Sequence, residues 1–112
     1  MKILILESDP YEQKLISKEL KNYNLSYEPT VTRAINRLGV EEINFVLIDA
    51  DQKEPTYSWE ELASFLKQLN IEYSVFSSNG KVGIKDGNKI ISINEIPKEV
   101  NTKIRQQGVL AY

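Results

Sequence analysis

Asn44-Phe45-Val46-Leu47-Ile48-Asp49 lies near the middle of the chain and places four consecutive apolar residues before a carboxylate. A strand with one wet face alternates apolar and polar residues, whereas a strand buried on both faces is continuously apolar. Ile3-Leu4-Ile5-Leu6 has the same character and leads into the polar turn Glu7-Ser8-Asp9-Pro10. Both stretches therefore predict buried strands of a parallel sheet.

A helical pattern follows the first of these strands. Asp9 supplies a side-chain acceptor for free N–H groups and Pro10 suits a first helical turn, so we expect a helix to begin here. Apolar residues then recur at helical spacing as far as Tyr23. The next strand, over residues 25–31, contains Pro29 and is expected at a sheet edge or with a bulge.

Two more helices and one more strand continue the alternation. Thr32 can cap a short helix that stops at Gly39. Ser58 and Glu61 form a capping-box pattern before another helix, and a strand is predicted over residues 71–76. The resulting order, βαβαβαβ, implies right-handed crossovers and a parallel sheet between two layers of helices.

The alternation breaks in the segment that follows. The runs 81–85 and 89–93 flank Asp86-Gly87-Asn88, and Asp-Gly between two strand-like runs is a hairpin signal. Glycines at positions 80, 83 and 87 would each cost up to about 1 kcal/mol inside a helix. We therefore predict a β-hairpin in place of the fourth helix of the repeating pattern.

Length and composition predict one domain over residues 1–107, followed by an apolar tail over 108–112. Pro97 and Gly108 predict a final helix that starts at Pro97 and ends before Gly108. The chain has 112 residues, 14 Lys+Arg, 16 Asp+Glu, no His and no Cys. These absences exclude disulfides, thiol nucleophiles, imidazole bases and the common zinc sites. A net charge of −2 gives no general attraction to nucleic acid or anionic membrane, and the apolar run 3–6 is too short for a signal peptide or a membrane span. We expect a cytoplasmic protein.

Polar residues follow the predicted strands at their carboxyl ends, where open α/β sheets bind ligands. They are Glu7, Ser8, Asp9, Asp49, Asp51, Ser77, Ser78, Asn94 and Glu95. Converging carboxylates could hold Mg²⁺ and let one of them accept a phosphoryl group, since the metal neutralises developing charge. The alternative is that strand ends are polar because they meet solvent.

Three stretches, in this order and spacing, resemble response-regulator receiver domains. Residues 3–10 resemble the opening of that family, an apolar strand followed by an acidic turn and a proline. Residues 46–49 resemble its phospho-acceptor strand, with Asp49 at the acceptor position, and residues 75–78 resemble its fourth strand, with Ser77 where a Thr or Ser contacts the phosphoryl group. The resemblance covers most of the chain. It implies two-component signalling and a three-layer, doubly wound, flavodoxin-like α/β fold with five parallel strands.

Two departures from the family pattern affect the acidic site. Receivers carry two adjacent acids after the first strand, whereas this chain has Glu7 and Ser8, and Asp9 is better placed as a helix cap. Receivers also carry a Lys before a Pro after the fifth strand, and Ile96 takes that place here. A close charge pair is worth a few kcal/mol, and about 1.4 kcal/mol is tenfold in binding, so Mg²⁺ and phosphoryl binding should be weaker by orders of magnitude.

The leading hypothesis is therefore a non-enzymatic pseudo-receiver, a signalling or assembly module that contacts another protein or itself without phosphorylation or a cofactor. Asp49 would then be an inactive phospho-acceptor position, and the rest of the vestigial acidic site would be Glu7, Ser8, Asp9 and Ser77. The candidate partner surface consists of Val82 and Ile84 on the hairpin and Tyr112 in the tail.

Two alternatives stay open. A working receiver would accept phosphate on Asp49, with weakly bound Mg²⁺ held by Glu7, Asp9 and Asp49. A small Mg²⁺-dependent phosphotransferase would use the rim formed by Asp49 and Asp51. Asp49-Ala50-Asp51 also resembles the haloacid-dehalogenase nucleophile motif, but that family needs a downstream Lys and further acids in a much larger domain.

Overall fold

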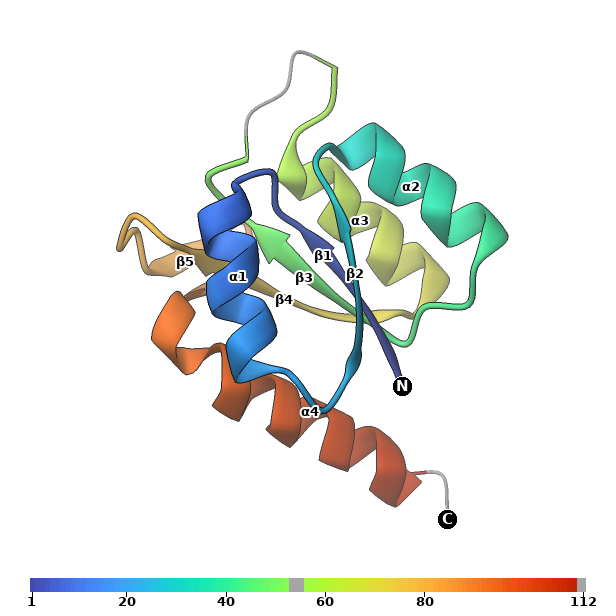
Figure 1. Cartoon of the computed structure of the whole chain (residues 1–112). Coiled ribbons are helices and arrows are strands. Elements are labelled where there is room, and N and C mark those ends of the chain that lie inside the picture. Colours follow the sequence, from blue (N-terminus) through green and yellow to red (C-terminus); the bar gives the residue numbers. More distant parts are fainter. Residues whose placement is uncertain (53–55, 111–112) are drawn as a thin grey trace.

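The computed structural model describes residues 1–52 and 56–110, and its strands form one six-stranded sheet in the order β2-β1-β3-β4-β6-β5 (Figure 1). The strands are β1 (Lys2–Leu6), β2 (Asn24–Glu28), β3 (Phe45–Asp49), β4 (Glu72–Ser77), β5 (Gly83–Lys85) and β6 (Asn88–Ser92). The helices are α1 (Pro10–Glu19), α2 (Val31–Val40), α3 (Trp59–Leu69) and α4 (Ile96–Leu110), with a 3₁₀ turn over Ile93–Glu95.

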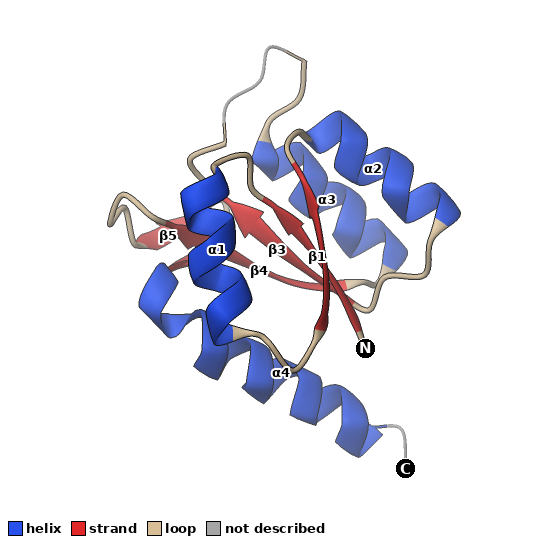
Figure 2. Cartoon of the chain, in the orientation of Figure 1, coloured by secondary structure: helices blue, strands red, loops and turns tan. Residues whose placement is uncertain are grey.

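The sheet separates two layers of helices. Strands β2, β1, β3, β4 and β6 are parallel to their neighbours, and β5 adds an antiparallel edge. Helices α1 and α4 cover one face, while α2 and α3 cover the other (Figure 2). The predicted three-layer, flavodoxin-like α/β fold with five parallel strands is therefore confirmed.

The two apolar runs are buried on both faces, as their continuous pattern predicts. Every residue of 3–6 and 45–48 is fully buried. Leu4 and Leu6 pack towards α2 and α3, whereas Ile3 and Ile5 pack towards α1 and α4. Because β1 and β3 pair in parallel, with Leu6 opposite Ile48, the residues that follow them lie side by side at one edge of the sheet.

Helix α2 begins and ends differently from the prediction. Its cap is Thr30, whose hydroxyl accepts from the Arg33 N–H at 3.2 Å, so the expected cap at Thr32 is wrong. The two threonines are of the same type, and the extended backbone at Thr30 decides between them. The helix also continues one residue past Gly39, because a single glycine lowers helix stability without ending the helix.

Helix α4 is longer than expected. It begins at Ile96 and continues to Leu110, so the predicted end before Gly108 is wrong. A glycine costs about 1 kcal/mol in a helix interior, which the neighbouring turns can offset. Tyr112 lies outside the described residues. The division between a domain over 1–107 and a tail over 108–112 stays a prediction.

The predicted hairpin is present, and we call residues 83–92 the ribbon. Strands β5 and β6 pair antiparallel, with Ile84 opposite Lys89. Asp86 and Gly87 join them with φ values of 52° and 79°. Two successive positive φ values are what the tightest hairpin turn requires. The edge position predicted for the strand over residues 25–31 is also confirmed, because β2 is the outer strand on the other side of the sheet. Its predicted end is wrong, since β2 ends at Glu28, before Pro29, and Val31 already belongs to α2.

The positive φ of Gly87 predicts the effect of an alanine substitution on stability, and Gly39 offers a matched control. Gly87→Ala should destabilise the protein by about 1 kcal/mol, because a left-handed backbone is strained for a residue with a Cβ. Gly39→Ala should stabilise it by about 0.5–1 kcal/mol, since Gly39 is helical and an added Cβ would meet open space. Urea unfolding measures both changes, and a Gly87→Ala variant as stable as the wild type would contradict the turn geometry.

Candidate functional site

The candidate site is the edge of the sheet at which β1, β3 and β4 end. Glu7 directly follows β1 and is 2% exposed, and Asp49, the last residue of β3, is 5% exposed. Ala50 donates its N–H to the Phe76 carbonyl at 2.8 Å, which continues the pairing of β3 with β4. Ser77, the last residue of β4, is also buried. The predicted residues Glu7, Asp49 and Ser77 therefore lie at one rim.

Glu7 and Asp49 form a buried carboxyl pair. The Asp9 N–H donates to Glu7 Oε2 at 3.0 Å, and the Asp51 N–H donates to Asp49 Oδ1 at 2.8 Å. The second oxygen of Glu7, Oε1, is buried and accepts from no donor among the described residues. When Glu7 carries a proton it can instead donate to Asp49, which lies close enough to affect the pKa of Glu7. The pair is therefore best satisfied with one shared proton.

Burial decides where that proton lies. Burial raises the pKa of Glu7 to about 8, and the charge of Asp49 adds to the rise. Burial also raises the pKa of Asp49, while hydrogen bonds from the Asp51 N–H and from Glu7 oppose the rise. Glu7 therefore keeps its proton to a higher pH than an ordinary carboxyl, and the protonated form can donate to Asp49.

No cation balances these acids in the described part of the chain. None of the ion pairs within residues 1–52 and 56–110 involves Glu7, Asp49 or Asp51. The pKa of Glu12, on α1, is raised as well, first by burial and then by the charges of Asp9 and Asp49. These upward shifts show acids that are desolvated and repel one another.

Ile96 belongs to the core. Its side chain is 1% exposed and packs with Val100 and Ile93 between α4 and the sheet. Ile96, which precedes Pro97, therefore contributes an apolar side chain to the core between α4 and the sheet.

The remaining predicted residues of the site, Ser8 and Asp9, are not arranged as metal ligands. Ser8 and Asp9 are exposed, and the Asp9 carboxylate accepts from the Tyr11 N–H at 2.9 Å, which makes it the cap of α1 as expected. Within the described ranges, no three Asp, Glu, His or Cys side chains form a group that could hold a metal ion. The set of Glu7, Asp9 and Asp49 is thus not brought together around a common point.

Asp51 is the residue whose role the sequence analysis missed. Its carboxylate accepts from the hydroxyl of Ser77, at 3.2 Å to Oδ1 and 3.0 Å to Oδ2. Oδ2 also accepts from the Ser78 N–H at 3.1 Å, the Ser78 hydroxyl at 3.3 Å and the Asn79 N–H at 3.3 Å. The available signal was an acid two residues after β3 together with Ser-Ser-Asn after β4.

A hollow of about 420 Å³ lies between the ribbon and the start of α3. Asp51, Trp59 and Ile84 are among the residues that line it. Lys85 closes one side, because its ammonium lies 5.9 Å from the centre of the Trp59 ring and 3.4 Å from a carboxylate oxygen of Glu60. The ribbon is therefore attached to α3 at this end.

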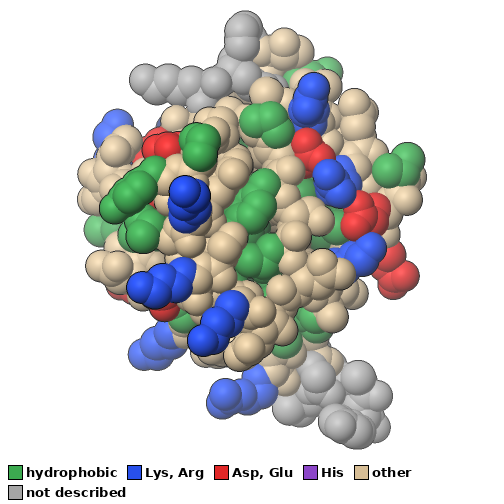
Figure 3. Space-filling view, viewed as in Figure 1, with side chains coloured by type: hydrophobic (Ala, Val, Ile, Leu, Met, Phe, Trp, Pro, Cys, Tyr) green, Lys and Arg blue, Asp and Glu red, His purple; other side chains and the backbone are tan. Residues whose placement is uncertain are grey.

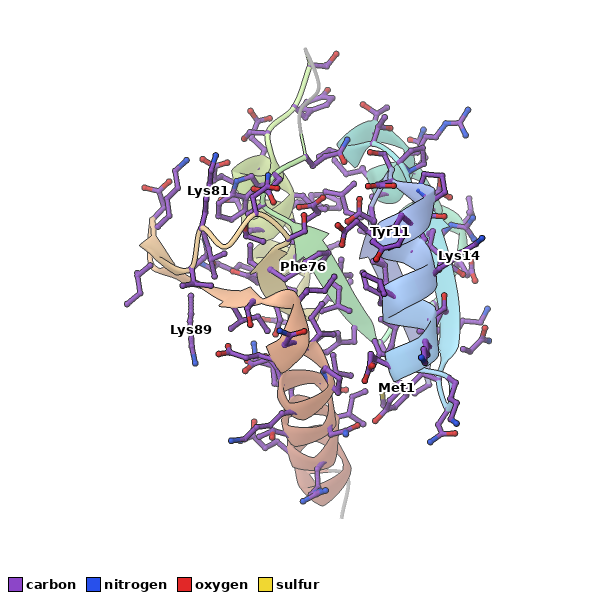
Figure 4. All side chains as sticks on the ribbon, turned by 60° about the vertical axis from the view of Figure 1, so that its left-hand side comes forward. Met1, Tyr11, Lys14, Phe76, Lys81 and Lys89 are labelled. Carbon is purple, nitrogen blue, oxygen red and sulfur yellow. The ribbon has the colours of Figure 1, made fainter. Side chains whose placement is uncertain are left out.

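The ribbon presents both apolar and basic side chains to solvent. Ile84 is 79% exposed, and Val82 is exposed just before β5. Figure 4 shows Lys81 and Lys89 projecting from the ribbon side of the molecule, with Phe76 in the interior. On the face seen in Figure 3, lysine and arginine side chains are separated by apolar and polar ones and do not form a continuous basic patch.

The structure is similar to several solved receiver domains. One is the N-terminal domain of a response regulator/sensory box/GGDEF protein from Carboxydothermus hydrogenoformans, with a TM-score of 0.81, 15% identity and 100% of each chain covered. A CheY-like receiver domain from Methanospirillum hungatei JF-1 has a TM-score of 0.76 and 15% identity, over 96% of this chain and 95% of the other. The receiver domain of the Francisella response regulator 1452 has a TM-score of 0.75 and 17% identity, over 95% and 98%.

The chain therefore has the fold of response-regulator receiver domains. No family model and no curated protein matches the sequence. None of the helices in the described residues is long and apolar enough to cross a membrane. With identities of 15–17%, the similarity identifies the fold, and the chemistry depends on the residues at the rim.

Proposed function

We propose that this protein is a cytoplasmic, non-enzymatic pseudo-receiver, a signalling or assembly module that acts by contact with another protein or with itself, without phosphorylation of Asp49. The observation that carries the proposal is that Glu7 and Asp49 are both buried at the rim and have no ion-pair partner among the described residues. The receiver fold supplies the class of function.

A phosphoryl group on Asp49 would be poorly accommodated here. It would replace the single carboxylate charge of Asp49 by about 1.5 to 2 negative charges at pH 7, at a rim where Glu7 is buried and Asp51 is half-buried. Mg²⁺ could offset that charge, but Glu7 would have to give up its proton to serve as a charged ligand, and its pKa is raised to about 8 by burial. A neighbouring ammonium could also offset it, but Ile96 occupies the position at which receivers carry one. Both sources of compensation are therefore weakened.

The ribbon is the proposed contact surface. β5 is an outer strand, so one row of its backbone N–H and C=O groups has no partner strand within the described sheet. Such an edge pairs readily with an added strand, and exposed side chains such as Val82 and Ile84 would add apolar contact. Tyr112 stays part of this proposal on sequence grounds alone.

The test of the chemistry is intact mass after incubation with acetyl phosphate and Mg²⁺. The wild type should remain unmodified, like the Asp49→Asn variant, while a phosphorylatable receiver domain in the same reaction should gain a phosphoryl group. A stable adduct that Asp49→Asn abolishes would favour the working-receiver alternative. Turnover of an aryl phosphate would favour the phosphotransferase.

The contact surface makes a separate prediction. Ile84→Glu should reduce capture of the partner, or self-association, by tenfold or more, since it places a charge in an apolar contact. Asp49→Asn should leave it unchanged. Val40→Glu is the matched control, because Val40 is 87% exposed on α2, away from the ribbon. Quantitative capture from native lysate and sedimentation of the pure protein measure the two cases, and loss of binding in Asp49→Asn alone would refute the proposal.

A further inference from the structure

The Asp51 carboxylate fills a cluster of donors that we call the loop cradle, formed by the Ser77 hydroxyl, the Ser78 N–H and hydroxyl, and the Asn79 N–H. All four donors lie within 3.0–3.3 Å of Asp51 Oδ2. The Ser77 hydroxyl is also 3.2 Å from Oδ1. Asp51 comes from the segment after β3 and the cradle from the segment after β4, so the contact joins two loops that are 26 to 28 residues apart in sequence.

The cradle has the chemistry of an oxyanion site. Successive backbone N–H groups and hydroxyls that point at one place form a concave set of positive partial charges. Hydrogen bonds from such donors to a charged acceptor are shorter and stronger than those to a neutral one. Asp51 supplies the anion from within the chain, so an external oxyanion would have to displace this carboxylate before it could use the same donors.

The cradle continues directly into the ribbon. Ser77 Oγ, which donates to Asp51, also accepts from the Asn79 N–H at 3.3 Å and the Lys81 N–H at 3.2 Å. Lys81 stands two residues before Gly83, the first residue of β5. Because the Ser77 hydroxyl donates its hydrogen to Asp51, the lone pairs of Ser77 Oγ are left to accept from the N–H groups of Asn79 and Lys81.

The segment from Lys81 to Lys85, which includes β5, therefore has an anchor at each end. At one end is the chain of contacts from Asp51 through Ser77 to Lys81. At the other end Lys85 lies over Trp59 and pairs with Glu60. The hollow beside Trp59 separates the two anchors, and both Asp51 and Lys85 line it. Between them Ile84 is 79% exposed, and the other support of the three-residue strand β5 is its antiparallel pairing with β6.

We propose that Asp51 is an intramolecular latch, a resident anion that occupies the loop cradle and holds the segment leading into β5, the outer strand of the ribbon, in one position. The latch makes the position of this segment independent of any bound oxyanion. This inference goes beyond the proposed function, because it concerns how the surface is held and not what the surface binds.

Hydrogen–deuterium exchange on the full chain tests the latch. Asp51→Ala should speed exchange at Asn79, Lys81 and β5 by tenfold or more, and leave β1 and β2 unchanged. Asp51→Asn, which keeps an acceptor oxygen without the charge, should give a smaller increase and guards against failure of the alanine variant to fold. Glu42→Gln is the control for loss of one charge, because Glu42 is exposed and precedes β3, at the opposite end of that strand from Asp51.

Trp59, the single tryptophan of the chain, gives a second readout because it lines the hollow under the ribbon. Quenching of Trp59 emission by acrylamide should increase at least twofold in Asp51→Ala. Added sodium formate, a free carboxylate that fits the emptied cradle, should reverse at least half of that increase and have no effect on Glu42→Gln.

In the exchange experiment, unchanged rates at Lys81 and β5 in Asp51→Ala would overturn the latch, and so would a uniform increase across all strands. In the quenching experiment, a complete lack of rescue by formate would overturn it. None of these measurements involves phosphorylation or a partner. Their failure is therefore distinguishable from failure of the proposed function, which the acetyl phosphate reaction tests separately.

Discussion

Glu7→Gln is expected to stabilise the protein by about 2–4 kcal/mol at pH 8.5 and to change its stability little at pH 4.5. Glutamine has the shape of the protonated acid and needs no buried charge. The wild-type carboxyl, by contrast, must ionise in a buried site as the pH passes its raised pKa of about 8. The rise from the ordinary value of 4.5 corresponds to at most about 5 kcal/mol, and coupling to Asp49 reduces what one substitution recovers.

The direction of the pH dependence follows from proton binding. Between pH 4.5 and about 8 the folded state keeps the Glu7 proton while the unfolded chain releases it. The stabilisation from Glu7 is thus fully present below pH 4.5 and is lost as the pH rises through about 8. Asp49 and Glu12, whose pKa values are also raised, act in the same direction and remain in the variant. The variant should therefore show a weaker fall in stability across this range, not a flat profile.

Urea unfolding between pH 5 and 9 measures this change, with Glu42→Gln as the control for an exposed acid. The control should follow the wild-type profile. Parallel profiles for the wild type and Glu7→Gln would show that Glu7 is ionised in the folded protein at neutral pH. The shared-proton description of the rim would then be wrong.

Ile96→Lys has the second large expected effect, a loss of about 4 kcal/mol or more in the free energy of unfolding. The substitution removes apolar contacts with Val100 and the sheet, and it places an ammonium group in a position that is 1% exposed. A Lys at this position, as in the receiver pattern, should therefore lower the free energy of unfolding and should not by itself make Asp49 reactive. This result would explain why one substitution does not return the chain to the receiver pattern.

Ile96→Leu is the matched control and should cost less than about 1.5 kcal/mol, because it nearly conserves the buried volume. Thermal and urea unfolding of both variants at pH 7 provide the comparison. An Ile96→Lys protein as stable as the control would mean that the new ammonium reaches the rim. The pKa of Asp49 would then fall, which titration by NMR could detect.

Local patterns were sufficient to predict most of the fold. Continuous apolar runs identified β1 and β3, and Asp86-Gly87 identified the hairpin, because each signal depends on residues close together in sequence. The same reasoning was wrong at Thr32, because Thr30 two residues earlier caps α2 instead. It was also wrong at Gly108, because one glycine does not end α4. Helix ends depend on small energy differences that tertiary packing can reverse.

The site was only partly predictable, because its chemistry depends on burial and on contacts between loops. The positions of Asp49 and Ser77 at the rim follow from strand order. The proton on Glu7 does not, since its pKa depends on how completely the surrounding elements exclude water. The contact of Asp51 with Ser77 depends in turn on how two separate loops approach each other, which no local spacing encodes.

A crystal structure in the presence of Mg²⁺ and beryllofluoride, which mimics a phosphoryl group on aspartate, tests the central claim most directly. The account predicts neither ligand at Asp49, with Glu7 still hydrogen-bonded to Asp49 and Asp51 still in the loop cradle. Beryllofluoride attached to Asp49 and Mg²⁺ coordinated by Glu7 would contradict it.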